Sequence, residues 1–386
     1  MFSSISFFLS NIANKKPMDN IAIYIYDFSL LGGCQKVTAN LVKLFHKQAF
    51  PVKAVISYEV KGDMDYDYPT DIELIDCNHN IKLIKEWLID NKIKNLIVQV
   101  ENLPLCNTII DSIEGTGINI MPVLHNTPFY WLRKYYSLRQ YLENPRLIAQ
   151  YIKMKLYWHN LHMSIFHKLA TKRIICVSKQ AKEEMSKILG ESYANNIHYI
   201  YNTLDIETIK DSSKKNIITY VGRLSVEKRP FLMLKVWKKI AANNSNWKLR
   251  IIGDGPAKQE MEHYCTRNRL NNVVFTGKVN NVNSYLAESK ISILFSKYEG
   301  LPTGILESCA CNNALVGCYN DGGLSDIIEN GVNGYIVDAN ANQLAFAILQ
   351  IMNNPPLFET MSANNKQVME KFTNKEIINS WLALLK

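Results

Sequence analysis

The stretch Ser292–Leu315 reads SILFSKYEGLPTGILESCACNNAL and contains one complete strand, loop and helix unit. Its first residues form a short apolar run typical of a buried strand, and a loop with Gly and Pro follows. A helix is predicted to begin near Thr303, with a Thr or Ser side chain capping its backbone N–H groups. Glu299 lies in the loop and Glu307 lies on the helix. A strand that leads into a helix through such a loop is the repeating unit of a parallel sheet.

The same order of elements recurs along nearly the whole chain of 386 residues. It predicts an α/β fold whose parallel sheets are covered by helices. The strand candidates of the first series are Ile21–Phe28, Val52–Tyr58, Ile72–Asp76, Leu96–Val100, Ile118–Leu124, Arg173–Val177 and Ile197–Tyr201. Those of the second series are Ile217–Gly222, Leu249–Ile252, Val273–Thr276, Ile291–Phe295, Ala314–Gly317 and Tyr335–Val337.

A polar stretch without periodicity, residues 202–216, separates the two series. We therefore expect two Rossmann-like domains facing across a cleft, which is where such folds bind their ligands. The expected organisation is a mobile leader (1–17), an N-terminal domain (18–205) with a helical insert (127–170), a C-terminal domain (206–372) and a C-terminal helix (373–386).

The composition is that of a folded protein, because 47% of the residues are apolar and 20% are charged. No apolar run reaches the ~18 residues of a membrane-spanning helix. The eight cysteines form no regular framework, so we expect free thiols in the reducing cytoplasm. Cys309, Cys311 and Cys318 lack the spacing and the histidine of a zinc site, and we interpret them as buried apolar side chains.

The net charge of +9 is concentrated in the helical insert. Between Tyr130 and Arg173 there are nine basic residues and one acidic residue, Glu143, with aromatic residues between them. Two interpretations are open. The insert is an amphipathic helical pair that packs on its domain with solvated bases, or it is an element that docks an acceptor or an anionic membrane surface. The spacing of its three histidines does not favour a metal site.

Two motifs of the second half can bind a diphosphate. Free N–H groups from Gly300 to Gly304 form a cradle for an anion, while the two glutamates can accept hydrogen bonds from sugar or ribose hydroxyls. In Tyr220–Pro230, YVGRLSVEKRP, the side chains of Arg223 and Lys228 can clamp a diphosphate leaving group. The alternatives are helix-cap and surface charges for the glutamates and a solvated basic turn for the cations.

Four other stretches carry weaker signals. Gly33, before a helix expected near Lys36, can present backbone N–H groups to a phosphate or simply form a tight turn. His125, at the carboxyl end of a strand, can donate a hydrogen bond to a sugar hydroxyl or be a core histidine. IIGDGP, which ends at Pro256, lacks the third glycine of a dinucleotide fingerprint and is weak evidence for NAD. DMDYDYP has the D-x-D spacing of metal-dependent sugar transferases, and we interpret it as a solvated acidic loop.

Taken in order, these motifs resemble the retaining glycosyltransferases of family 4, which have the GT-B fold. The resemblance is carried by Gly32–Gly33, His125, GRL-x-x-EK at 222–228, GDGP at 253–256, EGLPTGILE at 299–307 and DGGLSDIIENGVNGYIVD at 321–338. It covers residues 20–386 and is stronger in the second half. It implies that the second domain binds a nucleotide sugar and that the first binds the acceptor.

The resemblance implies a catalytic role for four residues. Glu299 corresponds to the glutamate that contacts the donor sugar, and His125 to a histidine near that sugar. Arg223 and Lys228 correspond to the pair that binds the diphosphate. We expect front-face attack, in which the departing diphosphate accepts the proton of the acceptor hydroxyl.

The resemblance also implies a donor-binding set. Glu307 would hold the nucleotide ribose, and Gly33 would lie close to the phosphate. The backbone cradle would comprise Pro302, Thr303, Gly304 and Ile305. The chain departs from the family in two places. The usual GGAER-like stretch reads GGCQK, and the usual AcGxPVV reads CACNNALVG, with residues 312–314 (Asn-Asn-Ala) in place of the family's Gly and Pro.

The implied reaction transfers a hexose from a nucleoside diphosphate sugar, expected to be UDP-linked, to a glycan or lipid-linked acceptor. It would retain the anomeric configuration and serve cell-surface polysaccharide synthesis. No metal, no cofactor and no nucleic-acid partner is implied, and we expect a cytoplasmic enzyme, peripheral on the inner face of the membrane. The alternatives are a nucleotide-sugar epimerase of the same architecture, an NAD-dependent oxidoreductase and a non-catalytic glycan-binding protein.

Overall fold

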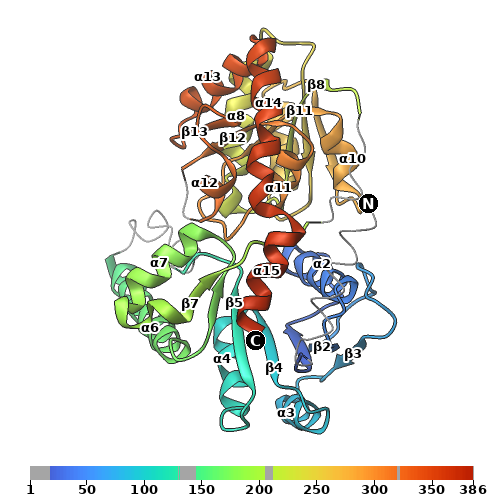
Figure 1. Cartoon of the computed structure of the whole chain (residues 1–386). Helices are drawn as coiled ribbons and strands as arrows, with labels where there is room; N and C mark the ends of the chain where they lie inside the picture. Colours follow the sequence, from blue (N-terminus) through green and yellow to red (C-terminus); the bar gives the residue numbers. More distant parts are fainter. Residues whose placement is uncertain (1–17, 129, 131–144, 205–211, 320–321, 386) are drawn as a thin grey trace, which may run out of the picture. The chain divides into compact units, whose positions relative to one another are not determined.

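The computed structural model describes residues 18–128, 130, 145–204, 212–319 and 322–385 (Figure 1). The expected leader at 1–17, residues 131–144 of the insert and residues 205–211 of the expected linker lie outside the described residues. Within the described part, each of the thirteen predicted strands overlaps a strand of the structure. The predicted α/β class with parallel sheets is therefore confirmed.

The first sheet has seven strands in the order β3-β2-β1-β4-β5-β6-β7. Its strands are β1 (Ile21–Ile25), β2 (Val52–Ser57), β3 (Glu73–Asp76), β4 (Asn95–Val100), β5 (Asn119–Leu124), β6 (Ile174–Cys176) and β7 (Ile197–Tyr199). The helices between them are α2 (Gly33–Lys47), α3 (Ile81–Asp90), α4 (Leu103–Ser112), α6 (Pro145–Leu169), α7 (Lys179–Leu189) and the 3-10 helix η2 (Glu191–Asn196).

The second sheet has six strands in the order β10-β9-β8-β11-β12-β13. Its strands are β8 (Lys215–Val221), β9 (Lys248–Ile252), β10 (Val273–Gly277), β11 (Ser289–Leu294), β12 (Ala314–Cys318) and β13 (Gly334–Val337). Its helices are α8 (Pro230–Ala241), α9 (Lys258–Arg267), α10 (Val282–Ala287), α11 (Thr303–Ala310), α12 (Leu324–Ile327), α13 (Ala341–Met352) and α14 (Pro355–Met369), with the 3-10 helices η4 (Val226–Lys228) and η5 (Glu370–Phe372). The last helix of the chain is α15 (Asn374–Leu385).

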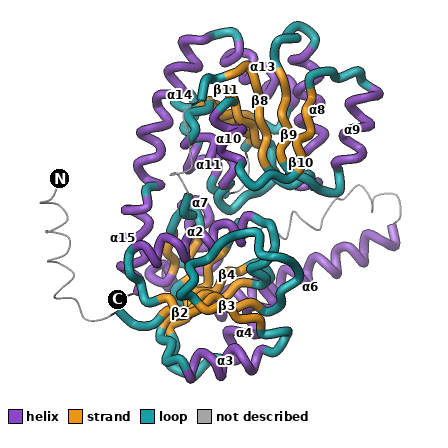
Figure 2. The backbone as a smooth tube through the Cα atoms, turned by 90° about the vertical axis from the view of Figure 1, so that its right-hand side faces the viewer, coloured by secondary structure: helices purple, strands orange, loops and turns teal. Residues whose placement is uncertain are grey.

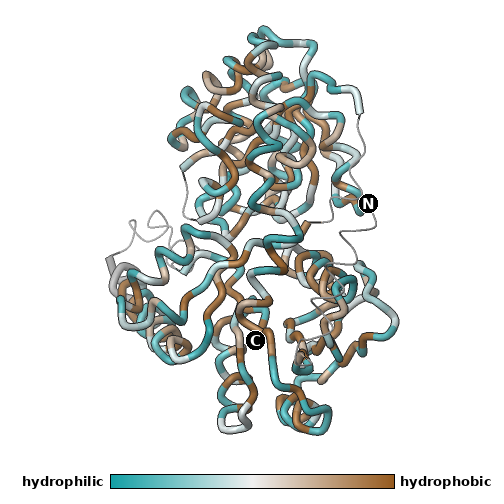
Figure 3. Tube along the Cα trace, in the orientation of Figure 1, coloured by the Kyte–Doolittle hydropathy of each residue, from teal (hydrophilic) through white to brown (hydrophobic). Residues whose placement is uncertain are grey.

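The central strands are apolar on both faces because helices cover both sides of each sheet. Every residue of β1, β4 and β12 is buried. The edge strand β3, ELID, is largely exposed and carries charged residues, which discourages pairing with another chain. Figure 3 colours the hydrophobic residues brown, and many of them lie in the strands. Burial on both faces explains why the strands read as apolar runs rather than alternating patterns.

The chain divides into two compact units. The first comprises the described residues up to Val123, Lys172–Ile174 and the chain from Asn374 on, and the second comprises Leu124–Thr171 and Ile175–Thr373. In the first unit α15 packs on α2, since the ring of Trp381 meets that of Phe45 edge-on at 5.6 Å. The domain boundaries expected from the sequence stay a prediction.

The insert is described as a single helix from residue 145 on. One side of the C-terminal half of α6 is buried through His162, Ile165, Phe166 and Leu169. The Nδ1 atom of His162 lies 2.9 Å from the carbonyl oxygen of Trp158. His162 is therefore a core histidine with a backbone partner, and no group of three metal-binding side chains occurs among the described residues.

Candidate active site

Two loops that follow the neighbouring strands β8 and β9 are held together through their backbones. The Gly222 N–H donates to the carbonyl oxygen of Ile252 at 3.0 Å, and the Leu224 N–H donates to that of Asp254 at 2.9 Å. A Cβ atom at position 253 would lie 2.0 Å from the Gly222 carbonyl oxygen, so only glycine permits this approach. The GDGP stretch therefore serves the packing of the two loops.

The two predicted cations both lie between β8 and α8, but their surroundings differ. The Arg223 side chain is exposed and has no hydrogen-bond or ion-pair partner among the described residues. Lys228 ends the short helix η4, and its Nζ lies 2.5 Å from Oε1 of Glu299. The side chains of Lys228 and Glu299 are 21% and 13% exposed. Each of these two charges is therefore stabilised by the other.

Arg229, which follows Lys228, has a structural role. It lies in the left-handed region with a φ of +50° and provides the N-cap position of α8. Its Nη1 donates to the carbonyl oxygens of Phe295 and Ser296 at 3.2 and 3.3 Å and lies 3.2 Å from Sγ of Cys318. The guanidinium thereby fixes the start of α8 to the end of β11, which holds the loop that leads to Glu299.

The backbone of the Glu299 loop is fixed from the side of α12. Gly322 has a φ of +114°, and a Cβ atom there would lie 1.5 Å from the Glu299 carbonyl oxygen. The Gly323 N–H donates to the carbonyl oxygen of Gly300 at 2.7 Å. Because these contacts are made by backbone atoms, the position of Glu299 does not depend on mobile side chains.

Helix α11 begins at Thr303 as predicted, but the expected Thr or Ser cap is wrong. Pro302 occupies the N-cap position, and no side chain accepts a hydrogen bond there. The Ile305 N–H bonds back to Pro302 at 3.1 Å, so it is already used by the helix. The N–H groups of Thr303 and Gly304 therefore remain without a side-chain acceptor at the positive end of the helix dipole, which is a suitable place for an anion.

Glu307 lies one turn beyond this helix start. It is only 6% exposed, in contrast to an ordinary helix-surface glutamate. The start of the same helix contacts the end of β8, since a Cβ atom at Gly304 would lie 3.2 Å from the Val221 carbonyl oxygen. Glu307 is therefore carried by a helix whose position is fixed by close backbone packing.

His125 reaches the same region of the second unit. Its backbone carbonyl oxygen would lie 2.0 Å from a Cβ atom at Gly300, so the two backbones are in direct contact. Burial lowers the pKa of His125 to about 4. The imidazole is therefore neutral at pH 7, with one nitrogen that donates and one that accepts hydrogen bonds.

The structure thus brings together, in the second unit, the Lys228–Glu299 pair, His125 and the start of α11. Gly33 belongs to the first unit, where it is the first residue of α2. That helix begins three residues earlier than the start predicted near Lys36.

A polar cluster in the first unit was not predicted from the sequence. The Gln35 Nε2 donates to the carbonyl oxygen of Asp27 at 3.1 Å and to Oε1 of Glu101 at 3.0 Å. The Oε2 atom of Glu101 is inaccessible to solvent and has no hydrogen-bond partner among the described residues. Burial raises the pKa of Glu101 to about 7, although the hydrogen bond from Gln35 opposes this shift. The sequence held one signal that could have revealed this cluster. Asp27 and Glu101 each follow a strand, β1 and β4, and these two strands are neighbours in the sheet.

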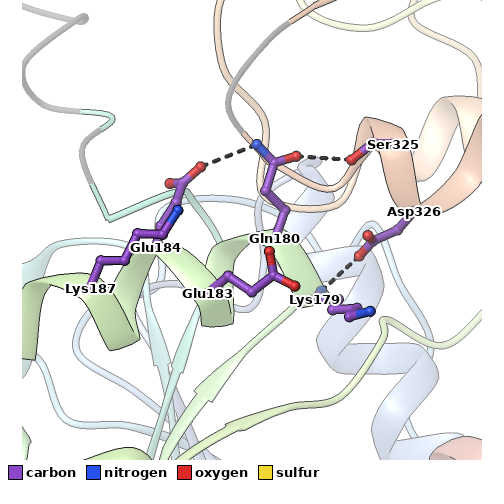
Figure 4. Close-up of a pocket in the computed structure, with 7 residues that line it drawn as sticks. All are labelled: Lys179, Gln180, Glu183, Glu184, Lys187, Ser325 and Asp326. Atoms are coloured by element: carbon purple, nitrogen blue, oxygen red, sulfur yellow. Dashed lines mark hydrogen bonds between the residues drawn. The ribbon is translucent and has the colours of Figure 1, made fainter. Parts of the chain in front are cut away.

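A hollow of about 370 Å³ lies between the first turns of α7 and the short helix α12 (Figure 4). Its lining is Lys179, Gln180, Glu183, Glu184, Lys187, Ser325 and Asp326. The Lys179 N–H donates to Oδ2 of Asp326 at 2.7 Å, and Ser325 donates to Oε1 of Gln180 at 2.9 Å. None of the site residues predicted from the sequence lines this hollow, and several of its polar groups bond to one another.

Comparisons with known proteins show what the chain is similar to. Residues 202–368 match the family model of the glycosyl transferases group 1. An uncharacterised glycosyltransferase of Haemophilus influenzae is 23% identical over 95% of this chain and 100% of its own length. The GalNAc-alpha-(1->4)-GalNAc-alpha-(1->3)-diNAcBac-PP-undecaprenol alpha-1,4-N-acetyl-D-galactosaminyltransferase of Campylobacter jejuni is 29% identical over 52% of this chain and 57% of its own length.

Among solved structures, the fold is similar to that of Staphylococcus aureus TarM, crystallised as a mutant with fondaparinux, alpha-GlcNAc-glycerol and UDP. The TM-score is 0.76 at 14% identity, and the match covers 96% of this chain and 100% of that one. The architecture predicted from the sequence, a GT-B fold with two Rossmann-like sheets, is confirmed.

The ion pair predicts a coupled effect on stability. Lys228→Met should lower the free energy of unfolding by about 1–3 kcal/mol, because it leaves the poorly exposed Glu299 carboxylate unpaired. Adding Glu299→Gln should recover most of this loss, since the charge that needed a partner is gone. Urea unfolding of the four proteins of this double-mutant cycle measures the coupling. Strictly additive effects would show that the two side chains do not stabilise each other.

The Glu101 carboxyl predicts a pH dependence with a definite sign. Its pKa rises from 4.5 in the unfolded chain to about 7 in the folded one, so the folded state holds a proton that the unfolded state has released. Stability should therefore fall as pH rises through this window. Glu101→Gln removes the titration and should be more stable than wild type above pH 7, by at most about 3 kcal/mol, and lose this advantage near pH 4. Equal urea midpoints for the two proteins at both pH values would contradict the burial of the carboxyl.

Proposed function

We propose that this chain, whose residues 202–368 match the family model of the glycosyl transferases group 1, moves a hexose from a nucleoside diphosphate sugar, UDP-linked, to an acceptor hydroxyl with retention of the anomeric configuration. The observation that carries this proposal is the Lys228–Glu299 pair beside the uncapped start of α11. One place thereby offers a cation, a carboxylate and free backbone N–H groups. A sugar diphosphate requires these three kinds of partner.

The leaving group is the part of the donor that the cations serve. The Lys228 ammonium has three N–H donors, of which one is directed to Glu299, so the others are available to a phosphate oxygen. Arg223 is exposed and adds a second cation from the same loop. The N–H groups of Thr303 and Gly304 complete an anion site at the start of a helix. Together they stabilise the charge that grows on the diphosphate as its bond to the sugar breaks, and no metal is required.

The sugar is held by the carboxylate of the same pair. Oε1 of Glu299 accepts the bond from Lys228, which leaves lone pairs on the carboxylate for hydroxyls of the hexose. His125, neutral at pH 7, can donate one hydrogen bond to the same sugar. The buried Glu307 is suited to the hydroxyls of the ribose, because a carboxylate shielded from water forms strong charge-assisted hydrogen bonds.

The chemical step proceeds on one face of the sugar. The bond between the anomeric carbon and the diphosphate oxygen breaks, and the acceptor oxygen forms its bond to the same carbon from the same side. The acceptor proton passes to the departing phosphate oxygen, so no enzyme base is needed. No side chain forms a bond to the anomeric carbon in this step.

We assign the acceptor to the first unit and propose a glycan or lipid-linked molecule in polysaccharide or glycoconjugate synthesis. The Campylobacter jejuni relative is named for an acceptor on PP-undecaprenol, which supports a lipid-linked one. The epimerase alternative is not carried further, since none of the proteins compared above is named an epimerase.

Two substitutions separate binding from turnover. Glu307→Ala should weaken UDP binding at least tenfold, because it removes a charge-assisted bond to the ribose. Glu299→Ala should bind UDP nearly as wild type and lower kcat by about 100-fold or more, since it acts on the sugar in the transition state. Calorimetry with UDP and steady-state kinetics measure the two effects. The exposed Glu359→Ala on α14 is the matched control, and wild-type behaviour of both active-site variants would refute the assignment.

The stereochemistry of the product tests the reaction itself. The anomeric proton of the product should show the same configuration as that of the donor sugar when the reaction is followed by NMR in excess EDTA. An inverted product would exclude the front-face mechanism. Loss of activity in EDTA that a divalent cation restores would exclude the metal-independent one.

A further inference from the structure

The stretch from Ile152 to Tyr157 in α6 consists of exposed residues, although Tyr151 just before it is buried. All six of its residues are exposed, and six residues span more than one and a half turns of helix. Further along the same helix one side is buried by Ile165, Phe166 and Leu169. Figure 2 shows α6 as one continuous helix. Tyr151 lies five turns before Leu169 and continues the buried side of α6, so the stretch is open to solvent on its other sides.

The exposed stretch is rich in large apolar side chains. The exposed fractions are 50% for Ile152, 37% for Met154, 56% for Leu156 and 62% for Tyr157. A helix at the surface of a globular protein normally turns its apolar side chains inward and its polar ones to water. Four apolar side chains within six exposed residues therefore indicate a surface that binds something.

The charge of α6 selects the kind of partner. The helix has 25 residues, of which four are basic and none is Asp or Glu. Two of the bases, Lys153 and Lys155, alternate with the exposed apolar residues and are themselves exposed. The partner must therefore offer negative charge and an apolar environment within a few ångströms of each other.

An anionic lipid surface meets both requirements. Ile152 and Leu156 are one turn apart on the same side of the helix and suit the boundary between headgroups and acyl chains. Lysine side chains reach the phosphates by extending along the interface, and tyrosine is common at that depth. A nucleic acid would use the lysines but would leave the apolar side chains in water. None of the helices that the structure describes is long and apolar enough to cross a bilayer, so the contact would be peripheral.

We propose that residues 152–157 of α6 bind the protein to the headgroup region of an anionic bilayer. Ile152, Leu156 and Tyr157 enter the boundary with the acyl chains, while Lys153 and Lys155 contact lipid phosphates. The purpose of this contact rests on the proposed function, because a lipid-linked acceptor lies in the same surface. The contact itself is independent of sugar transfer and can be measured without it.

The test is cosedimentation of the whole chain with vesicles of phosphatidylcholine, with and without phosphatidylglycerol. Wild type should bind the vesicles that contain phosphatidylglycerol, and binding should weaken as salt is raised. Lys153→Gln/Lys155→Gln should lower the partition coefficient about 25-fold, at about fivefold for each lysine. Ile152→Ser/Leu156→Ser should lower it at least tenfold, because the inserted apolar area is lost.

A matched control is available on α3. Lys82 is 80% exposed and its neighbour Leu83 is 46% exposed, but the two lysines of that helix are balanced by two acids. Lys82→Gln/Leu83→Ser should bind vesicles like wild type. The proposal would be overturned if wild type bound vesicles equally well with and without phosphatidylglycerol. It would also be overturned if Ile152→Ser/Leu156→Ser bound them as strongly as wild type. UDP binding of the same variants should be unchanged, and a wild type that binds vesicles but not UDP would refute the proposed function alone.

Discussion

The ion pair between Lys228 and Glu299 is the interaction on which the site depends. It joins the loop after β8 to the loop after β11, the two central strands of the six-stranded sheet. Both side chains are mostly shielded from solvent, so each charge is stabilised by the other. Gly322 and Gly323 then contact the Glu299 loop through backbone atoms, so the main chain fixes the position of Glu299. A site built in this way is pre-organised before a ligand arrives, which is what stabilisation of a developing charge requires.

Most of the fold could be predicted because each strand can be recognised from its own few residues. Strands buried on both faces leave continuous apolar runs, such as IAIYI in β1 and ALVGC in β12, and these can be recognised without knowing their neighbours. The start of α11 was also predicted, but its cap was not, because Thr303 and Pro302 are both acceptable near a helix start.

The end of α11 shows how the chain accommodates a departure from the family pattern. Asn312 has a φ of +57°, and its N–H and the next one bond back to Cys309 and Ser308, so asparagine fills the left-handed position where the family has glycine.

The pairing of the site residues could not be predicted, because it joins positions far apart in the sequence. Lys228 and Glu299 are separated by 71 residues, and Gln35 and Glu101 by 66. The sequence identified the first two as separate members of two motifs, and it gave no indication that one lysine donor is already used by the glutamate. Arg229 illustrates the same limit, since its partners Phe295 and Ser296 come directly after β11 and its third partner, Cys318, lies on β12.

Gln35 explains the other departure from the family, in which GGCQK stands for a GGAER-like stretch. Its Nε2 lies 3.0 Å from Oε1 of Glu101, a carboxyl that burial already keeps from ionising easily. A glutamate at position 35 would place a second carboxylate at that distance, and two such groups cannot both be ionised. The amide avoids this repulsion and donates to the Asp27 backbone as well. The neutral amide of Gln35 and the carboxyl of Glu101 at the end of β4 are therefore complementary. Replacing Gln35 by a charged residue, or Glu101 by a neutral one, would change the partner that the other side chain needs.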